Sequence, residues 1–266
     1  MRSIRRRLLA VILFCGASSA RASLPLETES ARTMPGGQVK LETAAEIQTS
    51  KEGREIAVPL ALEYAVTDDF EVQVEPVFFT AILPDQGPVA RGLGDVEATA
   101  TLRFLRETRL LPNLAVAVEV KLPTARNPRI GTGQADFTGY LVASKRFFDR
   151  LDLHLDLGYT FVGQPPGATL DNTINFGAAL ELHVTDRLDL LTEVIGNTAA
   201  SFGADAAESG TAVPNPVPEA AAGELIGLLG VRYRIASKLW LSLGVTYDNL
   251  HAVLFRPGIT WKFDTR

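Results

Sequence analysis

The sequence predicts an all-β protein, a transmembrane antiparallel up-and-down β-barrel of about 12 strands behind an N-terminal signal peptide, from three observations. Residues Leu151 to Phe161 alternate strictly, with apolar side chains at odd positions and Asp, His, Gly or Thr at even ones. Successive side chains of a strand point to opposite faces, so this segment has one apolar face and one polar face. Similar segments recur along the chain, separated alternately by tight turns and long loops, as in outer-membrane barrels.

Alternation and turn residues together predict the strands in order. The predicted ranges are Gln38 to Gln48, Glu55 to Ala65, Phe70 to Thr80, Asp95 to Leu105, Leu114 to Pro123, Phe137 to Phe147, Leu151 to Val162, Ile174 to Val184, Leu188 to Asn197, Glu224 to Ile235, Leu239 to Asp248 and Phe255 to Phe263. Every second connection is tight, so those turns and both termini are expected on the periplasmic side.

The apolar faces of these strands carry almost no charge. Leu114 to Leu122, for example, is apolar at every even position. A charge facing lipid would cost about 2 to 4 kcal/mol at the midplane, so this face is expected to contact hydrocarbon. Aromatic residues near strand ends, such as Tyr159 and Trp261, fit the girdles at membrane interfaces. The alternative is a soluble β-sandwich whose aromatics lie in its core.

The N-terminal residues differ from the rest of the chain. Four arginines at positions 2, 5, 6 and 7 precede an apolar run from Leu8 to Ala17, and Ala20-Arg21-Ala22 follows. This pattern predicts a secretory signal peptide over residues 1–22, cleaved after Ala22. Residues 23–36 are then expected to form a short periplasmic segment, and residues 37–266 the barrel. The protein is expected in the bacterial outer membrane, in contact with its lipid.

Charge and cysteine content exclude several classes of protein. Five of the 26 basic residues lie in residues 1–22, which leaves 21 basic against 31 acidic residues and a net charge of −10. Such a charge disfavours nucleic-acid binding. Cys15 is the only cysteine, so a mature chain without the signal peptide has no disulfide. No cofactor is expected.

Five short motifs follow one another in the middle of the chain: GLGD at 92–95, KLPT at 121–124, GTGQADF at 131–137, ASK at 143–145 and LGYTF at 157–161. In this order they resemble the outer-membrane transporters associated with the meta-pathway of phenol degradation. The resemblance implies a barrel that admits aromatic or other small molecules, and it assigns no substrate residues. The last strand also resembles the terminal strand that the barrel-assembly machinery recognises. Gly92, Gly94, Gly131 and Gly133 are expected to take unusual backbone angles where loops re-enter the wall.

The polar faces supply the candidate pore-lining residues. They are Glu42, Glu63, Glu71, Glu75, Glu97, Glu119, Lys121, Asp152, His154, Asp156, Glu181, His183, Arg232, Arg234 and Arg256. Carboxylates dominate the early strands and cations the tenth and twelfth. One interpretation is a transverse field across a water-filled constriction that sets selectivity. The other is a network of ion pairs that braces the wall, since twelve strands lie between filled small barrels and open porins.

Two histidines lie on neighbouring strands of this face. A symmetric hairpin would place His154 opposite Glu181 and Asp152 opposite His183. Such a group could bind a metal ion or gate with pH, but structural pairing is the preferred interpretation, so no metal site is predicted. A serine hydrolase needs Ser beside His. Ser144 is the nearest candidate and its face is uncertain, so no catalytic residue is predicted.

The sequence therefore favours a passive, porin-like channel for small solutes, and the resemblance implies that these include aromatic or other hydrophobic compounds. One alternative is a closed barrel with a structural or surface-interaction role, in which the long 198–223 loop is the contact element. A third is an outer-membrane lipid-modifying enzyme.

Overall fold

A computed structural model describes residues 24–167, 169–200 and 223–265. The described residues fold as antiparallel strands joined into one sheet, and they contain no helix long and apolar enough to cross a membrane. The strands are β1 (Gln38–Ala44), β2 (Glu46–Ser50), β3 (Gly53–Ala65), β4 (Phe70–Pro84), β5 (Ala90–Gly92), β6 (Val96–Leu105), β7 (Asn113–Leu122), β8 (Asp136–Phe147), β9 (Leu151–Phe161), β10 (Thr173–His183), β11 (Leu188–Asn197), β12 (Glu224–Ala236), β13 (Leu239–Asp248) and β14 (Val253–Asp264).

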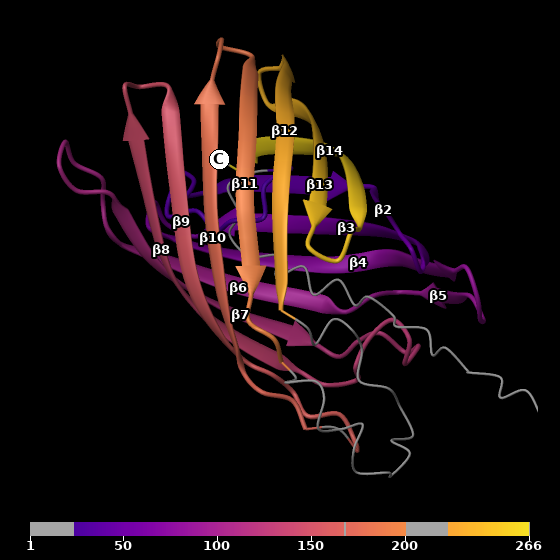
Figure 1. Cartoon of the computed structure of the whole chain (residues 1–266). Helices are drawn as coiled ribbons and strands as arrows, with labels where there is room; N and C mark the ends of the chain where they lie inside the picture. Colours follow the sequence, from indigo (N-terminus) through magenta and orange to yellow (C-terminus); the bar gives the residue numbers. More distant parts are fainter. Residues whose placement is uncertain (1–23, 168, 201–222, 266) are drawn as a thin grey trace, which may run out of the picture.

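The sheet closes on itself as a barrel. β1 and β2 both pair with β3 and β14, so they form one wall strand interrupted at Ala45. β5 and β6 both pair with β4 and continue each other in the same way. The fourteen segments of the described chain therefore make twelve wall strands, each paired with its sequence neighbours, and β1 pairs with β14. In Figure 1 the yellow C-terminal strands lie beside the indigo N-terminal ones. The predicted fold class is confirmed.

The two ends of the barrel differ in their connections. One end, here called the turn end, carries connections 66–69, 106–112, 148–150, 184–187 and 237–238. The opposite loop end carries connections 51–52, 85–89, 123–135, 162–172, 198–223 and 249–252. The first and last strands both have their free ends at the turn end, where Gln38 pairs with Asp264. Most of the 198–223 loop lies outside the described residues, as does the predicted signal peptide.

Alternation along β9 separates two environments. Leu155 and Leu157 are 43% and 57% exposed on the outer face, whereas Asp152 and His154 are only 3% exposed. An apolar outside and a buried charged inside reverse the arrangement of a soluble protein. The face assignment made from period 2 therefore holds for this strand.

One hairpin is longer than predicted. β4 continues to Pro84 and its partner strand begins at Ala90, where the sequence predicts a loop from residue 81 to 94. A β-bulge between Val58 and Pro59 shifts the register of β3 against β4. A bulge changes which face the following side chains occupy, so the period-2 signal is lost beyond it.

Three of the four motif glycines act by close packing, and Gly133 alone has the unusual backbone angle that was expected. Among the four, all of which the structure describes, only Gly133 has a positive φ, of 70°. A Cβ atom on Gly94 would lie 2.7 Å from the side chain of Val77, and one on Gly131 would lie 2.8 Å from Asp95. Asp95 also accepts a hydrogen bond from the Ala125 N–H at 2.8 Å. The Thr124 hydroxyl donates to the Gly94 carbonyl at 3.3 Å, so the first three motifs meet at the loop end.

Candidate functional site: the barrel interior

A charged network lines the interior near the turn end of β8 to β12. The Arg146 Nε donates to Asp152 at 2.8 Å. His183 lies between two carboxylates, with Nε2 3.1 Å from Asp152 and Nδ1 2.7 Å from Asp189. Arg232 joins Asp189, at 2.9 Å, to Glu181. Each carboxylate of this group therefore faces at least one cationic or histidine side chain.

The predicted pairing of the two histidines is wrong in register. Asp152 is opposite Glu181 and His154 is opposite Ala179, a shift of two residues. Alternation determines which face of a strand each side chain occupies, but it does not determine which residues of a long loop close the hairpin. A shift of the strand pairing by two residues therefore leaves the alternation of polar and apolar side chains unchanged.

One group in this network has the composition of a metal site. Asp152, Glu181 and His183 each offer a ligand atom, all within 4.8 Å of one another. Arg146 and Arg232, however, already contact the same carboxylates. Fixed cations beside the ligands disfavour a metal ion, so this arrangement favours structural pairing.

Ser144 and His154 lie side by side in the interior, which the sequence left open. The Ser144 Oγ is 2.8 Å from the His154 Nδ1, and Ser144 also accepts the Ala31 N–H at 2.9 Å. Both side chains are buried. A nucleophile must reach its substrate, and this hydroxyl is instead enclosed between two protein partners. The pair holds the N-terminal segment and gives no support to an enzyme.

The candidate acidic side chains of β1 to β4 each have a cationic or hydrogen-bonding partner. The Lys40 Nζ lies 2.6 Å from Glu63 and 3.2 Å from Glu42. Glu71 accepts the Met34 N–H at 3.0 Å. Glu75 accepts a hydrogen bond from Gln73 at 3.3 Å. Glu63 and Glu71 therefore have partners that their own strands do not supply, whereas Glu42 and Glu75 each have a partner two residues away on the same strand.

The remaining candidates are spread over the interior. Glu97 is opposite Lys121 and Glu75 on the two adjacent strands, and Lys121 pairs with Asp136. Glu119 is buried on β7, and Arg234 is half-buried near the turn end of β12. Arg256 contacts both Glu27 and Glu46. The structure thus brings Asp152, Glu181 and His183 together, but it leaves the remaining candidates in separate contacts.

Residues 24–34 run inside the barrel from the turn end, whereas the sequence places residues 23–36 in a periplasmic segment. From the turn end, the segment contacts β4 through Met34, β8 through Ala31 and β9 through Glu29, whose N–H donates to Asp156 at 2.8 Å. It continues to β11, where Glu27 N–H donates to Glu193 at 2.8 Å, and to β1 at Leu24. Burial of an extended backbone needs acceptors for its N–H groups, and the acidic wall provides them.

Two glycines make room for this segment. A Cβ atom on Gly230 of β12 or Gly244 of β13 would lie 2.6 or 2.7 Å from the ring of Pro25. Gly227, on the outer face of β12, would meet nothing closer than 4.0 Å. Glycines at inward strand positions, which lower strand propensity, were the available sequence signal for the segment, and sequence reasoning missed it.

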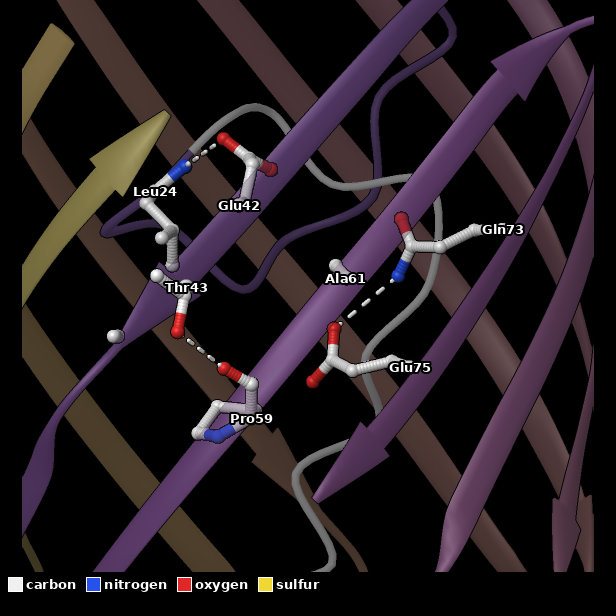
Figure 2. Close-up of a pocket in the computed structure, with 8 residues that line it drawn as sticks. Leu24, Glu42, Thr43, Pro59, Ala61, Gln73 and Glu75 are labelled. Atoms are coloured by element: carbon white, nitrogen blue, oxygen red, sulfur yellow. Dashed lines mark hydrogen bonds between the residues drawn. The ribbon is translucent and has the colours of Figure 1, made fainter. Parts of the chain in front are cut away.

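A small pocket remains where the segment reaches β1. Figure 2 shows Leu24 donating its N–H to Glu42, at 3.2 Å, with Pro59, Gln73 and Glu75 on the other side. Its cavity volume of about 10 Å³ is close to the room that one water molecule needs. It is too small for an organic solute.

Outside the membrane-spanning segments, charges cluster on the turns. Asp69 accepts hydrogen bonds from Arg106 at 2.6 Å and Arg103 at 2.9 Å, and these arginines lower its pKa to about 2. Glu107 lies 3.4 Å from Lys145 and contacts Arg32. Although partial burial opposes it, the hydrogen bond from the Arg146 N–H and these cations lower the pKa of Glu107.

Comparison with solved structures places the fold among outer-membrane barrels. An outer membrane channel from Pseudomonas putida F1 matches with a TM-score of 0.68 and 12% identity, over 88% of this chain and 98% of that one. NanC porin matches with a TM-score of 0.61 and 9% identity, over 84% of this chain and 100% of that one. KdgM porin, solved with oligogalacturonate, matches with a TM-score of 0.57 and 10% identity, over 84% and 99%. No family model and no curated protein matches the sequence.

Proposed function

We propose that the protein is a channel of the bacterial outer membrane for passive uptake of small solutes. The observation that carries the proposal is a closed barrel with an apolar outer face and a charged interior. A polar interior of this kind is what distinguishes diffusion channels from barrels filled by apolar packing. The similar structures are described as a channel and porins, which supports the same function here.

The substrate class follows from the sequence motifs. Their resemblance to transporters associated with phenol degradation favours aromatic or other hydrophobic compounds. The candidate pore-lining residues would then act on the polar part of the solute and on the ions that accompany it. Export through the predicted signal peptide and insertion by the barrel-assembly machinery belong to this proposal.

A closed barrel is the second candidate, because one observation favours it. Residues 24–34 contact β1, β4, β8, β9 and β11 across the interior, so solutes would pass only beside this segment or after it moves. A lipid-modifying enzyme has no comparable support from Ser144 and His154.

Swelling of proteoliposomes separates these functions. The chain is refolded into liposomes, which are placed in isotonic solutions of neutral solutes of increasing size. A channel gives swelling that slows as the solute grows. Gly230→Val, which would push against Pro25, is expected to increase the rate, while Gly227→Val on the outer face is the matched control. No swelling with any of the three proteins would favour the closed barrel, and release of fatty acid would favour the enzyme.

A further inference from the structure

The inner wall carries a strip of residues that fits an extended backbone. This strip, which contacts the N-terminal segment, is here called the track. Besides Gly230 and Gly244, two more inward glycines lie under the N-terminal segment: a Cβ atom on Gly177 would be 2.9 Å from the Thr28 hydroxyl, and one on Gly258 would be 3.0 Å from Leu24. The four lie near the middle of β10, β12, β13 and β14. The wall therefore lacks a side chain at four positions beneath residues 24–28.

Acceptors along the track bind main-chain N–H groups. Glu42, Glu193, Asp156 and Glu71 receive N–H groups from Leu24, Glu27, Glu29 and Met34. In the opposite sense, Arg256 Nη1 donates to the Pro25 carbonyl at 3.1 Å. Most of this recognition is directed at the backbone.

One apolar pocket fixes the position of the backbone on the track. Leu26 has no exposed surface and packs against Ala179, Leu191 and Leu228. A one-residue shift would place a glutamate or a proline in this pocket. Burial of the glutamate would remove the hydration of its carboxylate, and either shift would move the N–H groups away from their acceptors, so both shifts are disfavoured. The track therefore selects both an extended backbone and a leucine.

We infer that this track is a peptide-binding site, and that residues 24–34 are its tethered occupant. Pro35 and Gly36 are exposed at the turn end and connect the occupant to β1. Such a link raises the local concentration of the segment, to the order of mM for a short flexible linker, but it supplies none of the contacts named above. The same peptide, separated from the chain, therefore binds the vacated track and closes the lumen.

The test uses the full chain, cut only after folding. A protease recognition sequence is inserted between Pro35 and Gly36, the protein is refolded, cleaved and washed, and mass spectrometry measures the retained fragment. A synthetic peptide of residues 24–35, labelled with a fluorophore, is then added up to about 1 mM. Retention of the fragment through the wash, or saturable rebinding of the peptide, is the expected result. Loss of the fragment without rebinding would overturn the inference.

Two controls address the track itself. A peptide N-methylated at Glu27, Thr28 and Glu29 lacks the main-chain donors to Glu193 and Asp156, and should bind about tenfold more weakly or worse. Gly230→Val should weaken binding of the unmodified peptide, whereas Gly227→Val should not. Equal binding of both peptides, or by both variants, would contradict a backbone-directed track.

The expected change in conductance rests on the proposed function, so conductance is measured on the same samples as a separate test. Fragment release should raise conductance, and added peptide should lower it again. If the washed protein rebinds peptide but never conducts, the proposed channel function is contradicted and the peptide-binding site is still supported. If the washed protein conducts but binds no peptide, the peptide-binding site is contradicted and the proposed channel function is still supported.

Discussion

At the scale of single residues, Leu155 and Asp156 are adjacent in β9 but face different surroundings. Leu155 is exposed on the outer face, and Asp156 accepts the Glu29 N–H in the interior. We expect Leu155→Arg to lose about 2 to 4 kcal/mol through a cation in hydrocarbon. Asp156→Asn keeps an acceptor oxygen and should fold well. The yield of folded protein after refolding into lipid is the measurement, and equal yields would mean that the faces are reversed.

Asp69 on the 66–69 turn should give a pH-dependent contribution to stability. Its pKa in the folded protein is about 2, below the ordinary 3.8, chiefly because of the hydrogen bond from Arg106. A lowered pKa means that the ionised carboxylate stabilises the fold above about pH 4, and that this contribution disappears as the pH falls through about 2. The effect is small and sensitive to salt because the group is exposed.

The variant Asp69→Asn tests this sign. The urea midpoint of the wild type should exceed that of Asp69→Asn at pH 7, and the two should converge toward pH 2. A difference that is constant over this range would indicate that the carboxylate contributes nothing through its charge.

At the scale of elements, the position of residues 24–34 was the main error of sequence-based prediction. They precede the first predicted strand, and the sequence therefore predicts that they form a short periplasmic segment. The acceptors of Glu29 and Glu27 lie 127 and 166 residues away in the chain. No local pattern connects such positions. The strands, by contrast, were predictable because period 2 and turn residues are local signals.

Cysteine labelling tests the position of this element. Leu26→Cys, with Cys15 replaced if it is retained, should resist a membrane-impermeant maleimide because Leu26 is fully buried. Leu110→Cys, at a position 87% exposed on a turn, is the reactive control. Combination of Leu26→Cys with Gly230→Val should make the introduced thiol reactive. Rapid labelling of Leu26→Cys alone would place the segment outside the barrel.

At the scale of the whole molecule, closure was predictable and the contents of the lumen were not. The alternation of tight and long connections fixed an even strand number and the neighbour of each strand. Interior side chains were assigned to a face correctly at Asp152 and His154, yet their partners depend on the hairpin register and on the inserted segment. Both are properties of the closed barrel rather than of any one strand.

A closed barrel should resist detergent. Because pairing around the wall satisfies the backbone groups within lipid, unboiled protein in SDS should migrate differently from boiled protein. Circular dichroism should show β-structure in the unboiled sample. Identical mobility together with a helical spectrum would reject the fold.

The reversal potential across a planar bilayer under a salt gradient tests the central claim, a charged lumen that conducts, most directly. Acidic residues outnumber basic ones among the candidate pore-lining residues, and a narrow low-dielectric channel concentrates their field. We predict a preference for cations in the wild type, reduced when Glu63→Gln, Glu71→Gln and Glu75→Gln are combined. An unchanged preference in that triple variant would reject only the choice of residues. A preference for anions, or no conductance from the wild type and from Gly230→Val alike, would contradict the account.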